Sequence, residues 1–162
     1  MNYIIRELKK DETHLLNDFL YEAIFLPEGT EAPPKSIIDS PDLQVYISDF
    51  GNSIDDRCLV AETEGKVVGA VWVRIMNDYG HVDENTPSFA ISLYKEFRGL
   101  GIGTEMMKKM LLLLKENGYE QASLAVQKIN FAVKMYKNAG FEIVGENEEE
   151  YIMICKLSAL SI

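Results

Sequence analysis

A cluster of glycines in the second half of the chain combines residue types that favour anion binding. It reads Arg98-Gly99-Leu100-Gly101-Ile102-Gly103-Thr104 and lies between a strand-like stretch and an amphipathic stretch with helical spacing. Glycines let the backbone approach a ligand closely and adopt conformations that a side chain forbids. A helix N-terminus adds unpaired N–H groups and a partial positive charge. We therefore expect this segment to hold a phosphate group, with Arg98 as a nearby cation.

Two common nucleotide-binding motifs do not fit this cluster. The P-loop requires Gly-Lys followed by Ser or Thr, and no lysine follows Gly103. The dinucleotide fingerprint, if begun at Gly99, needs a small residue at Thr104 and an acidic residue at the end of the next strand, where Gln127 and Lys128 stand. Both motifs are excluded. The glycines also fit a purely structural role in tight packing of a helix on a sheet.

Two blocks of sequence resemble the motifs of one family. The stretch Leu93-Tyr94-Lys95-Glu96-Phe97-Arg98-Gly99-Leu100-Gly101-Ile102-Gly103 resembles the acetyl-CoA motif of the GNAT acetyltransferases, with Lys95 in place of the usual proline. Residues 130–141 resemble the second block, an asparagine ahead of a helix with tyrosine four residues before Gly-Phe; Val133 mainly breaks the match. Residues 61–76 are similar to the family's central hairpin. The chain is therefore identified as a GNAT member.

The resemblance implies which residues contact acetyl-CoA, the co-substrate of the family. The backbone of Ile91, Ser92 and Leu93 would bind the pantetheine arm in a strand-like manner, and residues 99–104 would hold the pyrophosphate. Asn130 precedes a helix, where a short polar side chain accepts hydrogen bonds from the first turn. The resemblance adds a cofactor contact, and one asparagine can serve both partners through its carbonyl and its amide. No metal is implied.

Acetyl transfer to a primary amine involves two proton movements. An amine with a pKa near 10.4 is mostly ammonium at pH 7, and removing its proton costs about 4 to 5 kcal/mol. The departing thiolate, whose thiol has a pKa of about 8.5, leaves more easily beside a proton donor. The resemblance places Tyr136 against the cofactor sulfur, where its phenol would act as the general acid. The alternative is that Tyr136 only packs in the core, four residues after Ala132 on one helical face.

The general base is marked less clearly than the acid. In GNAT relatives with similar loops the strand before the glycine cluster often opens with Pro-Glu, whereas this chain has Pro87-Ser88. Glu84 is our candidate for the base. Asp83 and His81, in the same loop, are alternatives that act directly or through water. Acidic residues in loops are usually only solvated, so the assignment stays open.

Length and composition set limits on the class of protein. The chain has 162 residues, 47% of them hydrophobic and 26% charged, which predicts a globular domain spanning residues 1–162. Its net charge of −10 repels phosphate backbones, so we expect no nucleic-acid partner. The same charge suits a cationic amine substrate or simply solubility. The N-terminus lacks a leader-like segment and no apolar run is long, so we expect a cytoplasmic protein that does not enter a membrane.

Hydrophobic periodicity and turn residues predict the elements that position these groups. Strands are expected at 2–8, 58–63, 66–76, 88–94, 121–127, 141–146 and 151–157, and helices at 12–26, 42–50, 102–116 and 130–139. The dipeptide Glu64-Gly65 indicates a tight hairpin. With the resemblance, this order predicts a mixed α/β fold of the GNAT acyl-CoA N-acyltransferase type. Its sheet would be mostly antiparallel, with about seven strands flanked by about four helices.

Several further expectations concern packing and partners. Cys58 and Cys155 lie among strand-type residues and are expected to be buried, reduced thiols. The methionines of 102–116 fit a core helix. Tyr151 and Met153 are expected to be exposed on the last strands, where a sheet edge would pair two subunits as a homodimer.

The acceptor is the part that the sequence defines least. We expect its pocket to come from residues 26–50 and 77–87, with Trp72 or Tyr79 either lining it or packing in the core. The acceptor is a small primary amine or a protein amine, and the sequence does not distinguish acetyl from other acyl groups. A non-catalytic module that binds acyl-CoA with the same fold is the competing hypothesis.

Overall fold

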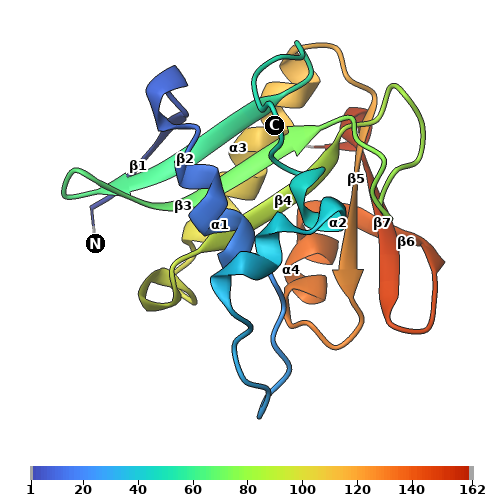
Figure 1. The fold of residues 1–162 in the computed structure, drawn as a ribbon. Helices are drawn as coiled ribbons and strands as arrows, with labels where there is room; N and C mark the ends of the chain where they lie inside the picture. Colours follow the sequence, from blue (N-terminus) through green and yellow to red (C-terminus); the bar gives the residue numbers. More distant parts are fainter. Residues whose placement is uncertain (1, 161–162) are drawn as a thin grey trace.

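A seven-stranded sheet organises the molecule. The computed structural model describes residues 2–160, and within this range the strand order is β1-β2-β3-β4-β5-β7-β6 (Figure 1). The strands are β1 Ile4–Glu7, β2 Arg57–Thr63, β3 Lys66–Arg74, β4 Ser88–Leu93, β5 Gln121–Gln127, β6 Phe141–Glu146 and β7 Glu150–Lys156. All neighbouring strands are antiparallel except β4 and β5, which are parallel. The predicted mixed fold with a mostly antiparallel sheet is confirmed.

Four α-helices cover the two faces of this sheet within the described residues. They are α1 Leu15–Glu22, α2 Pro41–Gln44, α3 Ile102–Glu116 and α4 Ala132–Ala139. Helices α1 and α2 lie on one face, called the front face below, and α3 and α4 lie on the other, the back face (Figure 1). None of these helices is long and apolar enough to cross a membrane.

The hairpin between β2 and β3 forms for a local reason. Its two turn residues, Glu64 and Gly65, have φ angles of 50° and 76°. Positive φ at both central positions matches the right-handed twist of the flanking strands. The structure thus confirms the expected tight hairpin. The turn sets the register of β3 against β2, and β4 pairs with the other edge of β3.

The back face holds the larger apolar core. Helix α3 repeats its apolar residues at spacings of three and four, and buries Ile102, Met106, Met107, Met110, Leu111 and Leu114 against the sheet. The methionines are therefore core residues, as expected. These buried residues form an apolar face that holds α3 against the sheet, and this contact determines where the N-terminus of α3 lies.

The front face has a smaller core centred on Trp72. This side chain is fully buried against Phe19 and Leu20 of α1, and its indole N–H donates to the backbone oxygen of Tyr46 at 3.1 Å. Trp72 therefore packs in the core, whereas Tyr79 is 39% exposed. The indole contact also fixes the position of Tyr46, which matters for the site described below.

Two helices are shorter than the sequence predicts. The helix expected at 12–26 is limited to α1, because the residues before it form a separate 3₁₀ turn, Lys10–Glu12, which Arg6 holds through the Glu12 carboxylate. The helix expected at 42–50 ends at Gln44. After Gln44, the Arg74 guanidinium donates hydrogen bonds to the backbone oxygens of Val45 and Ser48. Asp49 has a φ of 53°, which a right-handed helix does not allow.

The expected exposure of the last strand is wrong. Strand β7 lies between β5 and β6, so it is paired on both sides and does not form an edge. Met153 is fully buried, and Tyr151 is half-buried with the Lys128 ammonium 5.3 Å from its ring centre. The edge on this side is β6, because the final hairpin inserts its second strand next to β5.

Both cysteines are free and buried, as expected. Cys58 lies in the front core and Cys155 in the back core. Burial raises the pKa of both thiols, that of Cys155 to about 11, so neither is reactive at neutral pH.

Candidate active site

A gap between β4 and β5 is the central feature of the candidate site. β4 pairs with β3 along its whole length and β5 pairs with β7 along its whole length. Between β4 and β5 the ladder contains one pair, Ser88 with Ser123, after which the strands diverge (Figure 1). We call the end at this pair the closed end of the gap, and the end at the C-termini of both strands the open end.

Peptide groups of β4 face this gap. The amide of Tyr94 donates to the oxygen of Val68 at 3.0 Å, which sets the alternation of the β3–β4 ladder. Ser92 therefore pairs with β3, and the peptide groups of Ile91 and Leu93 point to the gap. Of the three residues expected to bind pantetheine, these two present backbone groups to it. The hydroxyl of Ser92 instead donates to the oxygen of Phe19 at 2.6 Å on the front face.

The glycine cluster forms an exposed turn at the open end. Gly99 and Gly101 have φ angles of 75° and 87°, in the left-handed region that other residues adopt at a cost. Gly101 is the N-cap of α3, and the first amide to bond within the helix is that of Glu105, to the Gly101 oxygen at 3.2 Å. The amides of residues 102–104 are thus left at a helix N-terminus beside the gap, where an anion is favoured.

Arg98 is oriented differently from the sequence expectation. Its Nε donates to the backbone oxygen of Leu93 at 2.9 Å, and its Nη2 lies 3.3 Å from a carboxylate oxygen of Glu22 on α1. The guanidinium therefore ties the turn to β4 and α1. Its side chain remains 48% exposed, so its outer edge still faces solvent near the turn.

Tyr136 lies on the back face near the closed end. It is 9% exposed, its ring packs edge-on to Phe141 with centroids 6.0 Å apart, and Phe141 in turn packs on Phe89 of β4 at 5.7 Å. Burial raises the pKa of Tyr136 to about 12. Its hydroxyl therefore keeps its proton throughout the neutral range.

Asn130 performs the capping role expected of it. Its Oδ1 accepts a hydrogen bond from the amide of Ala132 at 2.9 Å, at the start of α4. The neighbouring Phe131 is 96% exposed. The side-chain amide of Asn130 has no part in this bond and stays available to a ligand at the open end.

The loop residues proposed as bases lie away from Tyr136. Glu84 has an 85% exposed side chain, 3.4 Å from Nε2 of His81, and it borders a pocket of about 450 Å³ formed with the end of α3 and the start of β5. Tyr136 does not border that pocket. Asp83 caps its own turn through the amide of Asn85 at 2.8 Å. The loop acids and the phenol therefore do not border a common pocket among those of the described residues.

The structure brings another acid, Asp78, to the closed end of the gap. Its Oδ1 accepts a hydrogen bond from the Ser88 hydroxyl at 3.2 Å, and its Oδ2 accepts one from the Tyr46 hydroxyl at 3.0 Å. The Ser88 and Ser123 hydroxyls are 3.2 Å apart, and that of Ser123 donates to the oxygen of Gly80 at 2.8 Å. No motif marks Asp78, because its neighbours come from distant segments. The sequence gives one indication of Asp78, which is an acidic residue four positions after the end of the apolar strand β3.

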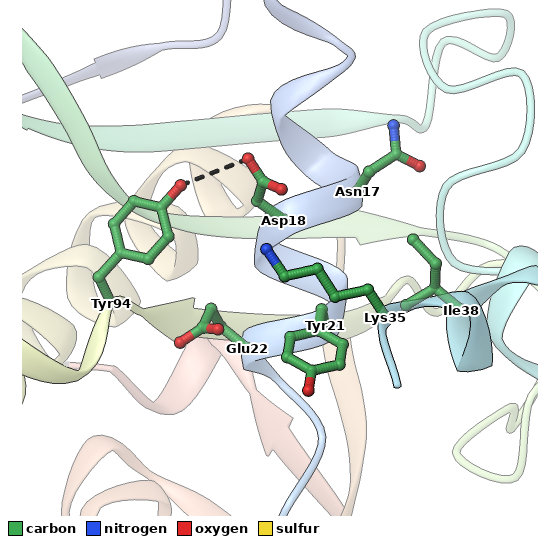
Figure 2. Close-up of a pocket in the computed structure, with 7 residues that line it drawn as sticks. All are labelled: Asn17, Asp18, Tyr21, Glu22, Lys35, Ile38 and Tyr94. Carbon is green, nitrogen blue, oxygen red and sulfur yellow. Dashed lines mark hydrogen bonds between the residues drawn. The ribbon is translucent and has the colours of Figure 1, made fainter. Parts of the chain in front are cut away.

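A small pocket on the front face lies beside the open end. It has a volume of about 150 Å³ and lies between α1, the 3₁₀ segment Lys35–Asp39 and Tyr94 (Figure 2). Asp18 and Glu22 border it, and the Tyr94 hydroxyl donates to Oδ2 of Asp18 at 3.4 Å. Lys35 contributes a cation to the same pocket. Within residues 2–160 no group of three or more histidine, cysteine or acidic side chains is arranged to hold a metal ion.

Comparison with known proteins identifies the family. Residues 20–141 match the model of the acetyltransferase (GNAT) family, and the chain belongs to that family. It is 29% identical over 110 residues to human N-acetyltransferase 8B, and the aligned region covers 65% of this chain and 48% of that protein. It is 29% identical over 114 residues to an N-alpha-acetyltransferase of Sulfurisphaera tokodaii, covering 60% and 68% of the two chains. The chain thus spans about half the length of the human relative.

A solved structure shows the same fold. The PaiA N-acetyltransferase of Thermoplasma acidophilum, crystallised with coenzyme A, superimposes with a TM-score of 0.71 over 96% of this chain and 99% of that one. The two sequences are 19% identical. At this identity the likeness concerns the fold, and the chemistry must be argued from the residues of this chain.

Proposed function

We propose that this protein is an N-acetyltransferase that moves the acetyl group of acetyl-CoA to a primary amine. The observation that carries the proposal is the gap between β4 and β5. Peptide groups of β4 border it along one side, the N-terminus of α3 lies at its open end, and a buried tyrosine lies behind its closed end. Membership of the GNAT family and the N-acetyltransferase relatives support the same reaction.

Main-chain groups would hold acetyl-CoA in this gap. The peptide groups of Ile91 and the amide N–H of Leu93 would continue a strand-like ladder to the pantetheine amides, whereas the Leu93 oxygen accepts from Arg98. The amides of residues 102–104 and the open turn at Gly99 and Gly101 suit the pyrophosphate, because a helix N-terminus attracts negative charge. The T. acidophilum structure of the same fold contains coenzyme A, which supports coenzyme A as the cofactor of this chain.

Tyr136 would assist the departure of the thiolate. Full proton transfer from a phenol of pKa about 12 to a thiolate whose thiol has a pKa near 8.5 is uphill by roughly 5 kcal/mol. The transfer must therefore be coupled to loss of a proton from the attacking amine. A hydrogen bond from the phenol to the sulfur strengthens as negative charge develops there, and it also lowers the barrier to departure of the thiolate.

The acceptor would approach from the front face, opposite to Tyr136. The acidic side chains Asp18 and Glu22 lie near the open end on this face, and the net charge of −10 attracts cations in general. These features favour an acceptor that carries its amine as an ammonium ion. A small polyfunctional amine and the N-terminus or lysine of a protein both meet this description.

Two measurements on the wild-type protein test the proposal. Titration calorimetry with coenzyme A is expected to show binding, and thiol release from acetyl-CoA is expected with at least one member of a panel of small amines and peptides. Binding without turnover on any acceptor would instead support a non-catalytic acyl-CoA-binding module. Lack of any affinity for coenzyme A would contradict both.

A further inference from the structure

The position of Asp78 relative to the gap follows from its hydrogen bonds. Ser88, which donates to its carboxylate, is half of the single pair that joins β4 to β5. Side chains alternate along a strand, and Ser92 of the same strand contacts Phe19 of α1. Ser88 and Asp78 therefore lie on the front face at the closed end. Tyr136 lies on the back face at this end, since it packs on Phe141 and Phe141 packs on Phe89.

Contacts from separate elements hold this carboxylate. Tyr46, which donates to Oδ2, is itself fixed by the indole of the buried Trp72. The backbone oxygen of Asp78 accepts from the amide of His81 at 3.1 Å, and Gly80 packs against the backbone of Leu124 and Ala125 in β5. The residue is only partly buried. Its orientation is thus set before any ligand binds.

We propose that the Asp78 carboxylate binds the ammonium group of the acceptor and takes up the proton that the amine must lose before it attacks the thioester. This inference rests on the proposed acetyltransferase function. It assigns the base to the front face and the acid, Tyr136, to the back face, with the reacting carbon in the gap between them.

The proton balance of the step is complete with these two groups. One ammonium proton passes to Asp78 and from there to solvent. The amine nitrogen then forms a bond to the thioester carbon, and the bond from this carbon to sulfur breaks. The leaving sulfur takes the phenolic proton of Tyr136, and the second proton lost by the nitrogen is returned through solvent to the phenolate. One acetylated amine, one thiol and one released proton result.

The surroundings of Asp78 strengthen it as a base. Burial raises its pKa above the usual value, although the hydrogen bonds from Tyr46 and Ser88 oppose this. Burial raises the pKa of Glu150, at the start of β7, and repulsion from the carboxylates of Glu149 and Asp78 raises it further. The other groups that face Asp78 are the hydroxyls of Ser88 and Tyr46, and His81 in its own loop. A raised pKa makes a carboxylate a stronger base, and two carboxylates on this face favour a cation.

The test is the pH profile of kcat/KM with the best acceptor of the panel. In the wild type, kcat/KM should level off above the pKa of Asp78 and well below that of the amine. Asp78→Asn, which preserves shape, should lower kcat/KM about 100-fold at pH 7. Its profile should lose the plateau and rise tenfold per pH unit up to the pKa of the amine, because only free amine reacts. Asp78→Glu should keep the plateau at a reduced rate.

Control variants separate this role from others. Asp11→Asn, an exposed charge removal in the 3₁₀ turn Lys10–Glu12, should stay within twofold of the wild type. The proposal is overturned if Asp78→Asn keeps the wild-type rate and plateau, or if Glu84→Gln or Glu150→Gln removes the plateau instead. A tenfold loss of coenzyme A affinity in Asp78→Asn also overturns it, because Asp78 would then act through the fold. Absence of turnover in the wild type contradicts the acetyltransferase function itself, a separate outcome.

Discussion

The two ends of the gap between β4 and β5 use different parts of the polypeptide. At the open end the groups aimed at a ligand are amides at the start of α3 and the exposed turn at Gly99 and Gly101. At the closed end they are side chains, Asp78 in front and Tyr136 behind, each with a pKa raised by burial. In the proposed function, binding depends on backbone conformation and chemistry depends on the proton affinity of these two side chains. Substitutions at the two ends should therefore change cofactor affinity and catalytic rate separately.

Tyr136→Phe should have the largest effect, and on the closed end alone. Removing the phenolic proton should lower kcat about 100-fold, because a positioned general acid contributes on that order. The affinity for coenzyme A should stay within twofold, since the ring still packs on Phe141. Steady-state kinetics and calorimetry measure the two quantities.

Tyr151→Phe is the matched control for this substitution. Tyr151 packs against the same back core, and Phe preserves its ring next to Lys128. Its kcat should be unchanged. Equal losses of kcat in both variants would show that a hydroxyl anywhere in this core affects the fold, and would remove the chemical role of Tyr136.

Gly101→Val should affect the open end and spare the closed end. A β-branched residue at a φ of 87° is strained, at a cost of about 1–2 kcal/mol in the free energy of unfolding. If the turn shifts, hydrogen bonds to a charged ligand are lost, and Kd for coenzyme A should rise about tenfold or more. Gly118→Val at the other end of α3 is the control, because its φ is 85° and its surroundings are equally open. It should lose similar stability without loss of affinity.

Ser88→Ala should have a smaller effect, again at the closed end. The hydroxyl of Ser88 lowers the pKa of Asp78, so its removal should raise that pKa further. The rising part of the pH profile should move to higher pH by roughly 0.5 pH unit, so that activity at any pH on this rising part falls about threefold. Exposed Ser48→Ala should leave the profile in place. A shift toward lower pH would contradict the hydrogen bond from Ser88 to Asp78.

Glu12→Gln should affect neither end and test the stability of the N-terminal segment alone. Arg6 holds the pKa of Glu12 at about 2, below its usual 4.5. A lowered pKa in the folded state gives stability that is present above pH 4.5 and is lost as pH falls toward 2. Because the pair is partly solvated, about 1 kcal/mol is expected at pH 7, measured by urea unfolding. The difference from the wild type should disappear near pH 2, and a constant difference would contradict it.

The open end could be predicted from the sequence because its chemistry belongs to the main chain. Glycines followed by a helical repeat specify a left-handed turn and a helix N-terminus wherever they occur, and β4 and α3 were found within a residue of their expected bounds. The same holds for the β2–β3 hairpin, where Glu64-Gly65 determines the turn locally.

Asp78, at the closed end, could not be predicted in this way, whereas Tyr136 was marked by the resemblance. Asp78 acquires its role through Tyr46, Ser88 and Ser123, which are 32, 10 and 45 positions away in the chain. No local pattern records such contacts, and the loop acid that the sequence favoured, Glu84, is exposed. The place of β7 between β5 and β6 was missed for the same reason, since strand order depends on tertiary pairing.

The single pair between β4 and β5 has a mechanical consequence. Strands β1 to β4 form one laddered unit and β5 to β7 another. The Ser123 amide bonded to the Pro87 oxygen at 2.9 Å and the adjacent Ser88 and Ser123 hydroxyls join the two units at this pair. A small rotation about this pivot widens the far mouth most and displaces Asp78 and Tyr136 least. Such a hinge would let a long, thin molecule enter and leave while the reacting groups keep their alignment.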